Sequence, residues 1–400
     1  MRTETVQCCV VGGGPAGMMA GLLLARAGVE VAVLEKYPDF FRDFRGDTVH
    51  PSTLRIMDEL GNVDELLRLP HRKVSTISLC TSAGEVTLAD FSRIGGRFPY
   101  VVFMPQWDLL NFLAEKARSY PNFTLLQHCP ATELVTEGGR VAGVRAERED
   151  GPLEIRANLV LAADGRHSTM RDAAGLTLAA SRSPIDVVWF RMSREEGEHA
   201  AFLYTGTGFM LICIDRGEYW QMAYVIPQGG YDQVRAEGLD RLCRDVASVR
   251  PDFAGRMSAE VDDWDKLKLL QVRVDRLRTW HRPGLLCIGD SAHAMSPAGG
   301  VGINLAVQDA VAAARMLSPV LIAGRVPTEQ QMHKVQRRRQ LAVRVVQAVQ
   351  VDMLSDLYPK DRTTRVQRPF AATLVQRVPA LSGMTARFIG LGIRPEHVDP

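Results

Sequence analysis

The sequence predicts an α/β fold of two interlocked lobes. Residues 6–35 have the pattern of a strand, a glycine loop, a helix and a second strand. Residues 183–227 contain repeated short strand-like runs, which are typical of an antiparallel sheet, and residues 231 to about 263 are mostly helical in pattern. At 400 residues the chain is longer than a usual single domain and short for three.

The first unit carries glycines at a defined spacing. After a short apolar run, which predicts a buried parallel strand, the chain reads Gly12-x-Gly14-x-x-Gly17. In this pattern the first glycine permits a tight turn, the second lets a pyrophosphate approach the backbone, and the third lets the helix pack on the strand. Pro15 and Ala16 open that helix, whose N-terminus then faces the phosphates.

The second strand of the unit ends at an acidic residue. Glu35 lies 18 residues after Gly17, where its carboxylate can accept hydrogen bonds from the hydroxyls of an adenosine ribose. The same carboxylate would repel the ribose phosphate of a bound NADP. The unit therefore predicts a bound dinucleotide, either FAD or NAD.

A polar loop follows the second strand and leads into a helix predicted from about residue 52 to 60. Arg45, His50 and the backbone between them offer a cation and polar groups to a phosphate or a flavin. An arginine in a loop is at least as often only solvated. The loop is therefore a hypothesis for a binding segment.

Alternation of apolar and polar residues over 74–104, around a turn at 82–84, predicts a hairpin outside the nucleotide lobe. A helix is predicted to begin near Gln106, whose exposed position at the helix start makes it a candidate ligand contact.

Strands are predicted at residues 123–128, 131–136, 140–147 and 159–163. Asp164 and Gly165 follow the last strand, at the carboxyl end where α/β sheets bind ligands. Asp-Gly after a strand is also common as a structural turn, so this pair is either a ligand-binding motif or a turn without a function of its own.

A third signature lies between residues 285 and 304. A short buried strand over 285–288 ends at Gly289 and Asp290. A glycine-rich turn over 297–302 then precedes a helix from Ile303, whose N-terminus can point at an anionic centre. His293 lies between the two, and we expect a hydrogen bond within its own loop rather than a ligand contact. Beyond it, residues 328–356 predict an amphipathic helix, and the remainder to residue 400 is expected to be irregular.

Composition narrows the class of protein. With 46% hydrophobic and 24% charged residues and a formal net charge of +2, the chain resembles an ordinary soluble globular protein, with no nucleic-acid-binding face. Its seven cysteines show no metal-ligand spacing, so we expect buried free thiols in a reducing compartment and no metal site. No apolar run approaches the ~20 residues of a membrane span. These features predict a cytoplasmic protein.

Together these stretches resemble the single-component FAD-dependent aromatic hydroxylases, the group that includes para-hydroxybenzoate hydroxylase and the ubiquinone-pathway hydroxylases, over residues 5 to about 320. The resemblance implies a Rossmann-like FAD-binding lobe interleaved with an antiparallel β-sheet substrate lobe, and a helical C-terminus. The FAD-binding lobe would comprise residues 1–73, 101–182 and 275–325; the substrate lobe 74–100 and 183–274; and the helical C-terminal segment 326–400.

The resemblance also implies roles for individual residues. Noncovalent FAD would be held by Gly12, Gly14, Pro15, Ala16, Gly17, Glu35, Lys36, Arg45, Gln106, Asp164, Gly289, Asp290, Pro297, Gly300, Val301, Gly302, Ile303 and Asn304. Of these, Pro297, Gly300 and Gly302 belong to the loop expected beside the isoalloxazine ring, where catalysis takes place. His50, Tyr204, Tyr224 and Pro297 are the residues expected to contact substrate, although aromatic residues at strand spacing are more often core.

Such enzymes take hydride from NADPH or NADH, react the reduced flavin with dioxygen, and pass one oxygen from a flavin hydroperoxide to an electron-rich aromatic small molecule. A monomer or a homodimer is expected. Three rivals share the fold: a flavin-dependent halogenase, a reductase of carbon–carbon double bonds, and a catalytically silent flavin-binding protein. Ile226 and Pro227 match the halogenase signature Trp-x-Trp-x-Ile-Pro, but Met222 and Tyr224 stand where its tryptophans would be.

Overall fold

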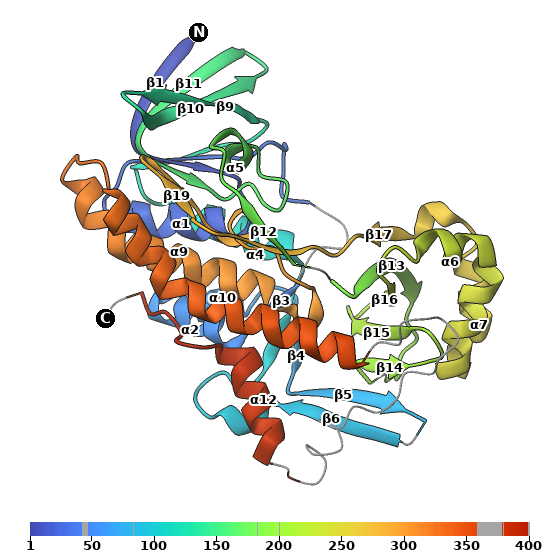
Figure 1. The fold of residues 1–400 in the computed structure, drawn as a ribbon. Helices are drawn as coiled ribbons and strands as arrows, with labels where there is room; N and C mark the ends of the chain where they lie inside the picture. The colour runs from blue at the N-terminus through green and yellow to red at the C-terminus, as the bar shows by residue number, and fades with distance from the viewer. Residues whose placement is uncertain are drawn as a thin grey trace.

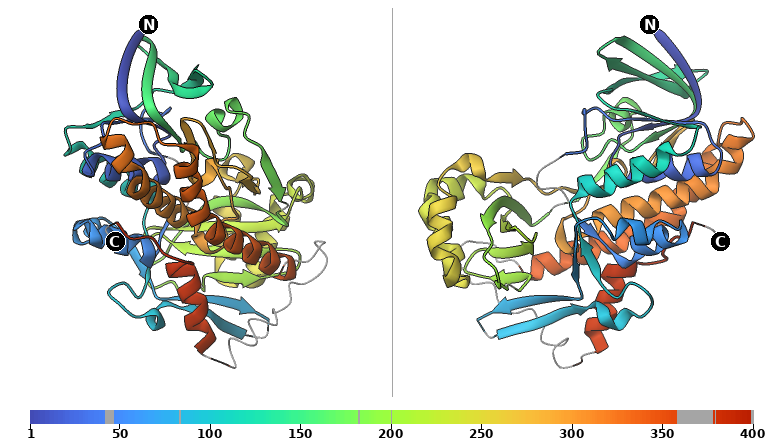
Figure 2. Two further views of the ribbon diagram at one scale, coloured as in Figure 1. Left: turned by 60° about the vertical axis from the view of Figure 1, so that its left-hand side comes forward. Right: turned by 180° about the vertical axis from the view of Figure 1, so that it is seen from behind.

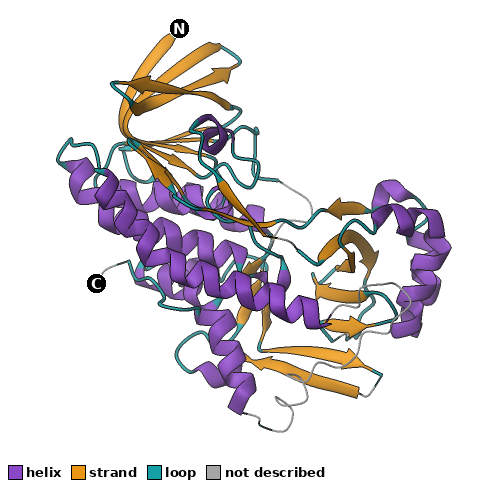
Figure 3. Ribbon diagram, viewed as in Figure 1, coloured by secondary structure: helices purple, strands orange, loops and turns teal. Residues whose placement is uncertain are grey.

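The structure is a computed structural model that describes residues 1–41, 47–82, 84–181, 183–199, 201–357, 378 and 380–398. Two large β-sheets lie beside a layer of long helices that runs from one to the other (Figures 1 and 3). The chain alternates between the sheets, since the first takes its strands from residues 2–34, 123–162 and 281–287, and the second from 76–90 and 185–270. This architecture confirms the predicted α/β class.

The first sheet is built on parallel strands in the order β20-β11-β1-β2-β8, with β9, β10 and β19 added antiparallel. Its strands are β1 (Arg2–Val11), β2 (Val31–Leu34), β8 (Phe123–Leu126), β9 (Ala131–Glu137), β10 (Arg140–Arg148), β11 (Gly151–Ala162), β19 (His281–Arg282) and β20 (Leu285–Cys287). The end of β1 and all of β2 are buried, as parallel strands covered on both faces require. Because the strands are parallel, the segments that follow β1, β2, β11 and β20 meet at one edge of the sheet.

Three helices form the main cover of this sheet: α1 (Pro15–Arg26), α4 (Gln106–Arg118) and α9 (Gly302–Ile322). α1 packs against both of the others, and their apolar residues belong to one core with the strands. Within the described part of the chain, one helix, Ala298–Ile322, is long and apolar enough by length and composition to cross a membrane. Its apolar window is 78% buried inside the protein, as expected of a central core helix.

The second sheet has the order β17-β13-β16-β15-β14-β5-β6, antiparallel except between β14 and β5. Its strands are β5 (Thr76–Thr81), β6 (Gly84–Asp90), β13 (Ile185–Ser193), β14 (Leu203–Thr205), β15 (Met210–Asp215), β16 (Tyr219–Pro227) and β17 (Lys268–Leu270). Helices α6 (Tyr231–Glu237), α7 (Leu239–Val249) and α8 (Ala254–Glu260) cover its outer face (Figure 2).

The inner face of the second sheet packs toward the rest of the molecule. Because strand side chains alternate, Val187 and Val225 share a core with Phe103 and with Leu354 and Ala386 of the C-terminal helices, whereas their neighbours Val188 and Tyr224 pack under α6–α8. We call the side that carries Val187 the inner face.

Of the two C-terminal helices, α10 (Glu329–Leu357) runs beside α9 toward the second sheet, and α12 (Ala380–Leu391) lies beside β6 (Figure 1). The remaining elements are α2 (Pro51–Glu59), α3 (Val63–Leu66), α5 (Thr169–Ala173), the sheet of β3 (Thr48–Val49), β7 (Val101–Phe103) and β4 (Arg72–Val74), the pair β12 (Leu178–Ser181) and β18 (Val274–Leu277), and the 3-10 turns η1 (Phe91–Ile94), η2 (Pro251–Phe253), η3 (Trp264–Lys266), η4 (Gly289–Ser291) and η5 (Ala298–Gly300).

Most predicted elements are confirmed with shifted ends, and three predictions were wrong in part. The strand predicted at 159–163 is the end of β11, which begins at residue 151. The hairpin predicted over 74–104 covers only β5 and β6, because β7 joins β3 and β4 in a separate sheet. The C-terminal stretch expected to be irregular contains α12, one face of which is buried. The prolines before this segment led to the prediction that it has no helix.

Candidate functional site

In the glycine loop after β1, the space around Gly12 and Gly17 is crowded, whereas the space at Gly14 is open. Gly12 has a φ of 105°, and a Cβ there would lie 2.4 Å from the carbonyl oxygen of Ala163. A Cβ on Gly17 would lie 1.8 Å from the carbonyl oxygen of Gly12, so α1 can reach β1 only without a side chain at this point. A Cβ on Gly14 would meet nothing within 4 Å. The loop thus leaves free space at the glycine where a pyrophosphate is predicted to approach.

The N-terminus of α1 opens into that space. Gly14 is its N-cap, no side chain caps the helix, and no acidic residue stands in its first turn. Pro15 occupies the first helical position and Ala16 is buried against Gly289, where a Cβ would come within 3.0 Å of the alanine methyl group. The first-turn N–H groups are therefore available to an anion.

Glu35 reaches from the end of β2 to the glycine loop. The side chain is only 8% exposed, and its two carboxylate oxygens accept hydrogen bonds from the N–H groups of Gly13 (2.8 Å) and Tyr37 (3.1 Å). Lys36 is exposed beside it. The carboxylate is thus fixed next to the loop, as the prediction of a ribose contact requires.

The ends of β11 and β20 bring two acidic motifs together. Asp164 accepts hydrogen bonds from Ser168 Oγ (2.5 Å) and from the Met170 N–H (3.1 Å), and burial raises its pKa. Asp290 is half-buried, with an oxygen 3.3 Å from Arg166 Nη2. Asp164 therefore supports the start of α5, while Asp290 keeps a partly exposed carboxylate.

The loop over 297–304 is fastened to the segment 48–53. Gly299 and Gly300 have φ values of 75° and 62°, and a Cβ on Gly300 would lie 2.2 Å from Thr48 Oγ1. Thr48 Oγ1 donates to the Gly300 carbonyl oxygen at 2.7 Å. Asn304 Oδ1 accepts from the His50 N–H (2.9 Å) and from Thr53 Oγ1 (2.6 Å). The predicted contact Asn304 thus holds the loop in shape.

α9 begins at Gly302, one residue earlier than predicted, and its N-cap residue Val301 provides no side-chain cap. Its first turn contains no acidic residue. Pro297 and Gly302 are half-buried, whereas Val301 and Ile303 are buried. The positive end of a 21-residue helix therefore lies at this loop.

His50 lies beneath the loop and is neutral in the folded protein. The ring is 1% exposed, and its Nδ1 is 2.8 Å from the carbonyl oxygen of Ile389 in α12. Burial lowers its pKa to about 4, although the carbonyl groups of Ile389 and Gly299 act in the opposite direction. Nε2 faces Gly299 without forming a hydrogen bond of good geometry. The structure thus places His50 in the support of the loop.

Asp47, just before β3, contacts Arg216, just after β15 of the second sheet, and sequence reasoning missed both residues. Asp47 accepts a hydrogen bond from the Gln106 N–H (3.1 Å) and forms an ion pair with Arg216, which also donates to Gln221. Burial raises the pKa of Asp47 to about 6, against the lowering effect of Arg216. Gln106 therefore contributes through its backbone at the start of α4. The predicted contact Arg45 lies outside the described residues.

Tyr204 and Tyr224 are placed on the outer face of the second sheet, away from the loop. Tyr224 donates to Asp245 of α7 (2.6 Å) and stacks on Phe209, and the Tyr204 hydroxyl accepts from Arg250 (3.2 Å). Both tyrosines lie on strands, as predicted. The side of the sheet that carries them is covered by α6–α8 and not by the loop 297–304. Neither tyrosine is retained as a substrate contact.

A buried charge network lies behind Asp290. His293 Nε2 is 2.5 Å from Asp309 Oδ2, which also accepts the Gly289 N–H (3.1 Å), so the partner of His293 is on α9 and not in its own loop as expected. Arg339 of α10 donates to Asp309 (3.0 Å) and to Glu396 (3.4 Å). Burial acts to raise the pKa of Asp309, but His293 and Arg339 outweigh it and hold that pKa below its ordinary value.

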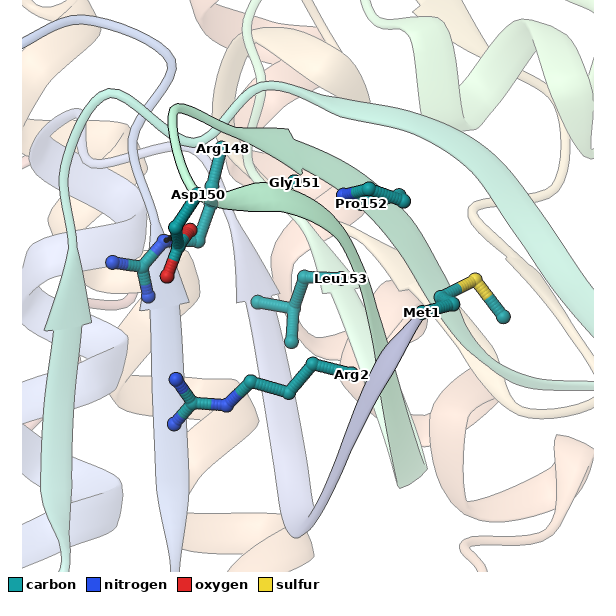
Figure 4. A pocket seen from close by; sticks show the side chains of 7 residues that line it. All are labelled: Met1, Arg2, Arg148, Asp150, Gly151, Pro152 and Leu153. Carbon is teal, nitrogen blue, oxygen red and sulfur yellow. Dashed lines mark ion pairs between the residues drawn. The ribbon is translucent and has the colours of Figure 1, made fainter.

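The hollow drawn in Figure 4 is not part of this site. It has a volume of about 120 Å³ and is lined by Met1, Arg2, Arg148, Asp150, Gly151, Pro152 and Leu153. These residues surround the beginning of β1, whereas the glycine loop follows its end, about 30 Å away along the strand.

Comparisons with known proteins agree with this geometry. A family model described as FAD binding domain matches residues 5–349. The 6-methylpretetramide 4-monooxygenase of Streptomyces rimosus is 32% identical over 383 residues, which cover 95% of this chain and 91% of that protein. The para-nitrophenol 4-monooxygenase of Pseudomonas sp. (strain WBC-3) is 25% identical over 340 residues, 82% of each chain. The solved structure of OxyS anhydrotetracycline hydroxylase from Streptomyces rimosus shares the fold, with a TM-score of 0.76 at 21% identity over 97% of this chain and 76% of that one.

Proposed function

Because the chain belongs to the family of FAD-dependent aromatic monooxygenases, we propose that it uses NADPH or NADH and dioxygen to hydroxylate a phenolic or other electron-rich aromatic small molecule. The observation that carries the proposal is the meeting of the glycine loop, Glu35, Asp290 and the loop 297–304 at one edge of the first sheet. Ala298 of that loop also packs against the inner face of the second sheet.

The residues at this edge fit FAD. The open space at Gly14 and the uncapped start of α1 suit the pyrophosphate, and Glu35 stands where an adenosine ribose would follow. The half-buried carboxylate of Asp290 suits a hydroxyl of the ribityl chain. Bound FAD would supply the hard chemistry, accepting hydride and delivering one oxygen atom to the aromatic ring through a flavin hydroperoxide.

Two features of the chain would support that chemistry. The N–H groups at the start of α9, held by Thr48 and Asn304, are donors fixed in advance for negative charge on a reduced flavin. The inner face of the second sheet presents apolar residues, among them Trp189, Met210 and Ile214, which would exclude water from the oxygen-transfer site. We place the substrate between that face and the loop 297–300.

The substrate class is proposed from the relatives. Two of them are named as 4-monooxygenases, of 6-methylpretetramide and of para-nitrophenol, and this supports an aromatic substrate for this chain too. We also propose that the FAD-binding and substrate lobes have the boundaries predicted from the sequence, and that the protein acts in the cytoplasm as a monomer or homodimer. All seven cysteines are free in the structure, in keeping with a reducing compartment.

The test is oxygen accounting with purified protein. The protein should carry FAD, oxidise NADPH or NADH faster when a panel of phenols is added, and place one labelled oxygen atom from ¹⁸O₂ in the product. Label entering from water instead would contradict the proposal. A requirement for chloride or bromide would indicate a halogenase, saturation of a double bond without oxygen uptake a reductase, and bound FAD without any turnover a silent flavoprotein.

A further inference from the structure

One face of α10 carries a stripe of buried polar side chains. Gln336, Arg339, Gln347 and Gln350 fall within an arc of about 80° at the 100° per residue of an α-helix, and none is more than 5% exposed. Buried amides cost free energy unless they are hydrogen-bonded. The hydrogen-bond partners of these side chains therefore show which segments α10 holds in place.

The glutamines of the stripe bond to main-chain groups on both sides of η4. Gln336 accepts the Trp280 N–H (3.1 Å) and donates to the Arg278 carbonyl oxygen (2.9 Å). Gln347 donates to the carbonyl oxygens of Asp275 (2.8 Å) and Ala294 (2.7 Å). α10 therefore fixes the course of residues 275–298 through their backbone, whatever their side chains are.

Gln350 contacts the flavin-side loop, residues 297–304, and the residue just before it. Its Nε2 donates to the carbonyl oxygens of Ser296 (3.0 Å) and Ala298 (2.7 Å), immediately before Gly299. Both partners are acceptors, so the amide can present only its NH₂ group to the loop. Oε1 has no hydrogen-bond partner within the described ranges, so the side chain is oriented by the loop alone.

We propose that Gln350 is a positioning residue that sets the backbone of residues 296–300 against the ring of bound FAD, a role that rests on the proposed function of that loop. Gly299 and Gly300 have left-handed φ values, and Gln350 holds the carbonyl groups of Ser296 and Ala298, the second of which directly precedes Gly299. Val351 and Leu354, one and four residues further along α10, pack in the core of the inner face together with Ala298. The same end of α10 therefore borders both the loop and the space proposed for substrate.

Two variants separate hydrogen bonding from simple packing. Gln350→Glu keeps the shape but sets a carboxylate oxygen against two carbonyl groups, whereas Gln350→Met removes the donors without adding charge. We expect both to keep FAD bound, because the glycine loop is untouched. Both should alter the visible circular dichroism of the bound flavin without substrate, and raise the ratio of peroxide to hydroxylated product by at least about threefold, more for Glu than for Met.

Matched controls make the same change elsewhere on α10. Gln330→Glu lies at the exposed start of the helix and should change nothing. Gln336→Glu is buried but remote from the loop, so it should lower the melting temperature and leave the flavin spectrum unaltered. If the Gln350 variants behave like Gln336→Glu, the role is only structural and the proposal fails. If the wild type binds FAD but hydroxylates nothing, the proposed function fails, while the circular dichroism comparison still decides the role of Gln350.

Discussion

Replacing Gly14 by valine tests whether the glycine loop holds a pyrophosphate or only makes a turn. Gly14 has φ −73° and ψ −175°, an extended conformation that valine adopts readily. A Cβ there would meet nothing within 4 Å. The side chain would therefore stand in the space left for the cofactor without touching the protein.

The expected magnitudes follow from this geometry. The loss of glycine at an N-cap costs up to about 1 kcal/mol of folding free energy, and the reduced freedom of the unfolded chain returns about 0.4–1 kcal/mol. The apoprotein should thus unfold within about 1 kcal/mol of the wild type. Losing even one charge-assisted hydrogen bond to a pyrophosphate costs about 1.5–3 kcal/mol, so FAD affinity should fall by about ten- to hundredfold or more.

The assay pairs thermal unfolding of the apoprotein with titration of FAD. Gly17→Ala is the matched contrast, because its Cβ would lie 1.8 Å from the Gly12 carbonyl oxygen and should destabilise the apoprotein itself, by about 1–3 kcal/mol or more. Full FAD occupancy in Gly14→Val would refute the assignment of this loop. Equal destabilisation of both apoproteins would show that the open space at Gly14 is needed for folding.

Three further variants address the rest of the site. Asp290→Ala should weaken FAD about tenfold in equilibrium titration, since its carboxylate is half-exposed, and unchanged affinity would make it a turn residue only. Gly302→Pro removes the N–H of the first residue of α9 and disfavours the αR conformation of Val301 before it, so it should distort this helix start, retain FAD at the distant glycine loop and give a larger share of NAD(P)H oxidation as peroxide. Undiminished coupling would exclude this N–H from oxygen transfer. His50 has its pKa lowered from 6.5 to about 4, so the folded protein binds fewer protons than the unfolded chain in that window and stability rises with pH through it. His50→Gln should therefore reduce the rise of the unfolding free energy between pH 4 and 6.5 by up to about 3 kcal/mol. Asp47, whose pKa is raised to about 6, has the opposite effect on stability in both proteins. If the unfolding free energies from urea titrations depend on pH equally in the variant and the wild type, the buried ring is not neutral.

The parts of the site that could be predicted are those defined by short motifs along the chain. Gly12, Glu35 and Gly289 follow strand ends, and parallel pairing brings all strand ends of one direction to the same edge of a sheet. A motif of this kind needs no knowledge of distant contacts, because the strand before it and the helix after it specify its place. The structure accordingly brings these residues to one edge of the first sheet, and their contact with a cofactor stays a prediction.

The facing of the second sheet could not be predicted in the same way. Val188 and Tyr224 differ from Val187 and Val225 only by one step along a strand, and almost all of these strand positions are apolar. With no polar alternation to mark a solvent side, the sequence contains no signal for which face α6–α8 cover. The position of Tyr204 on the outer face could not be predicted for the same reason.

The contacts that hold the flavin-side loop are the hardest part of the site to predict from the sequence, because they are made to main-chain groups. Gln350 recognises the carbonyl groups of Ser296 and Ala298, which every residue type provides, so no pairing of side chains records the contact. His50 likewise meets a main-chain oxygen of α12. Substitutions in α10 and α12 can therefore change the geometry of the loop while every glycine and acid of the recognised motifs stays in place.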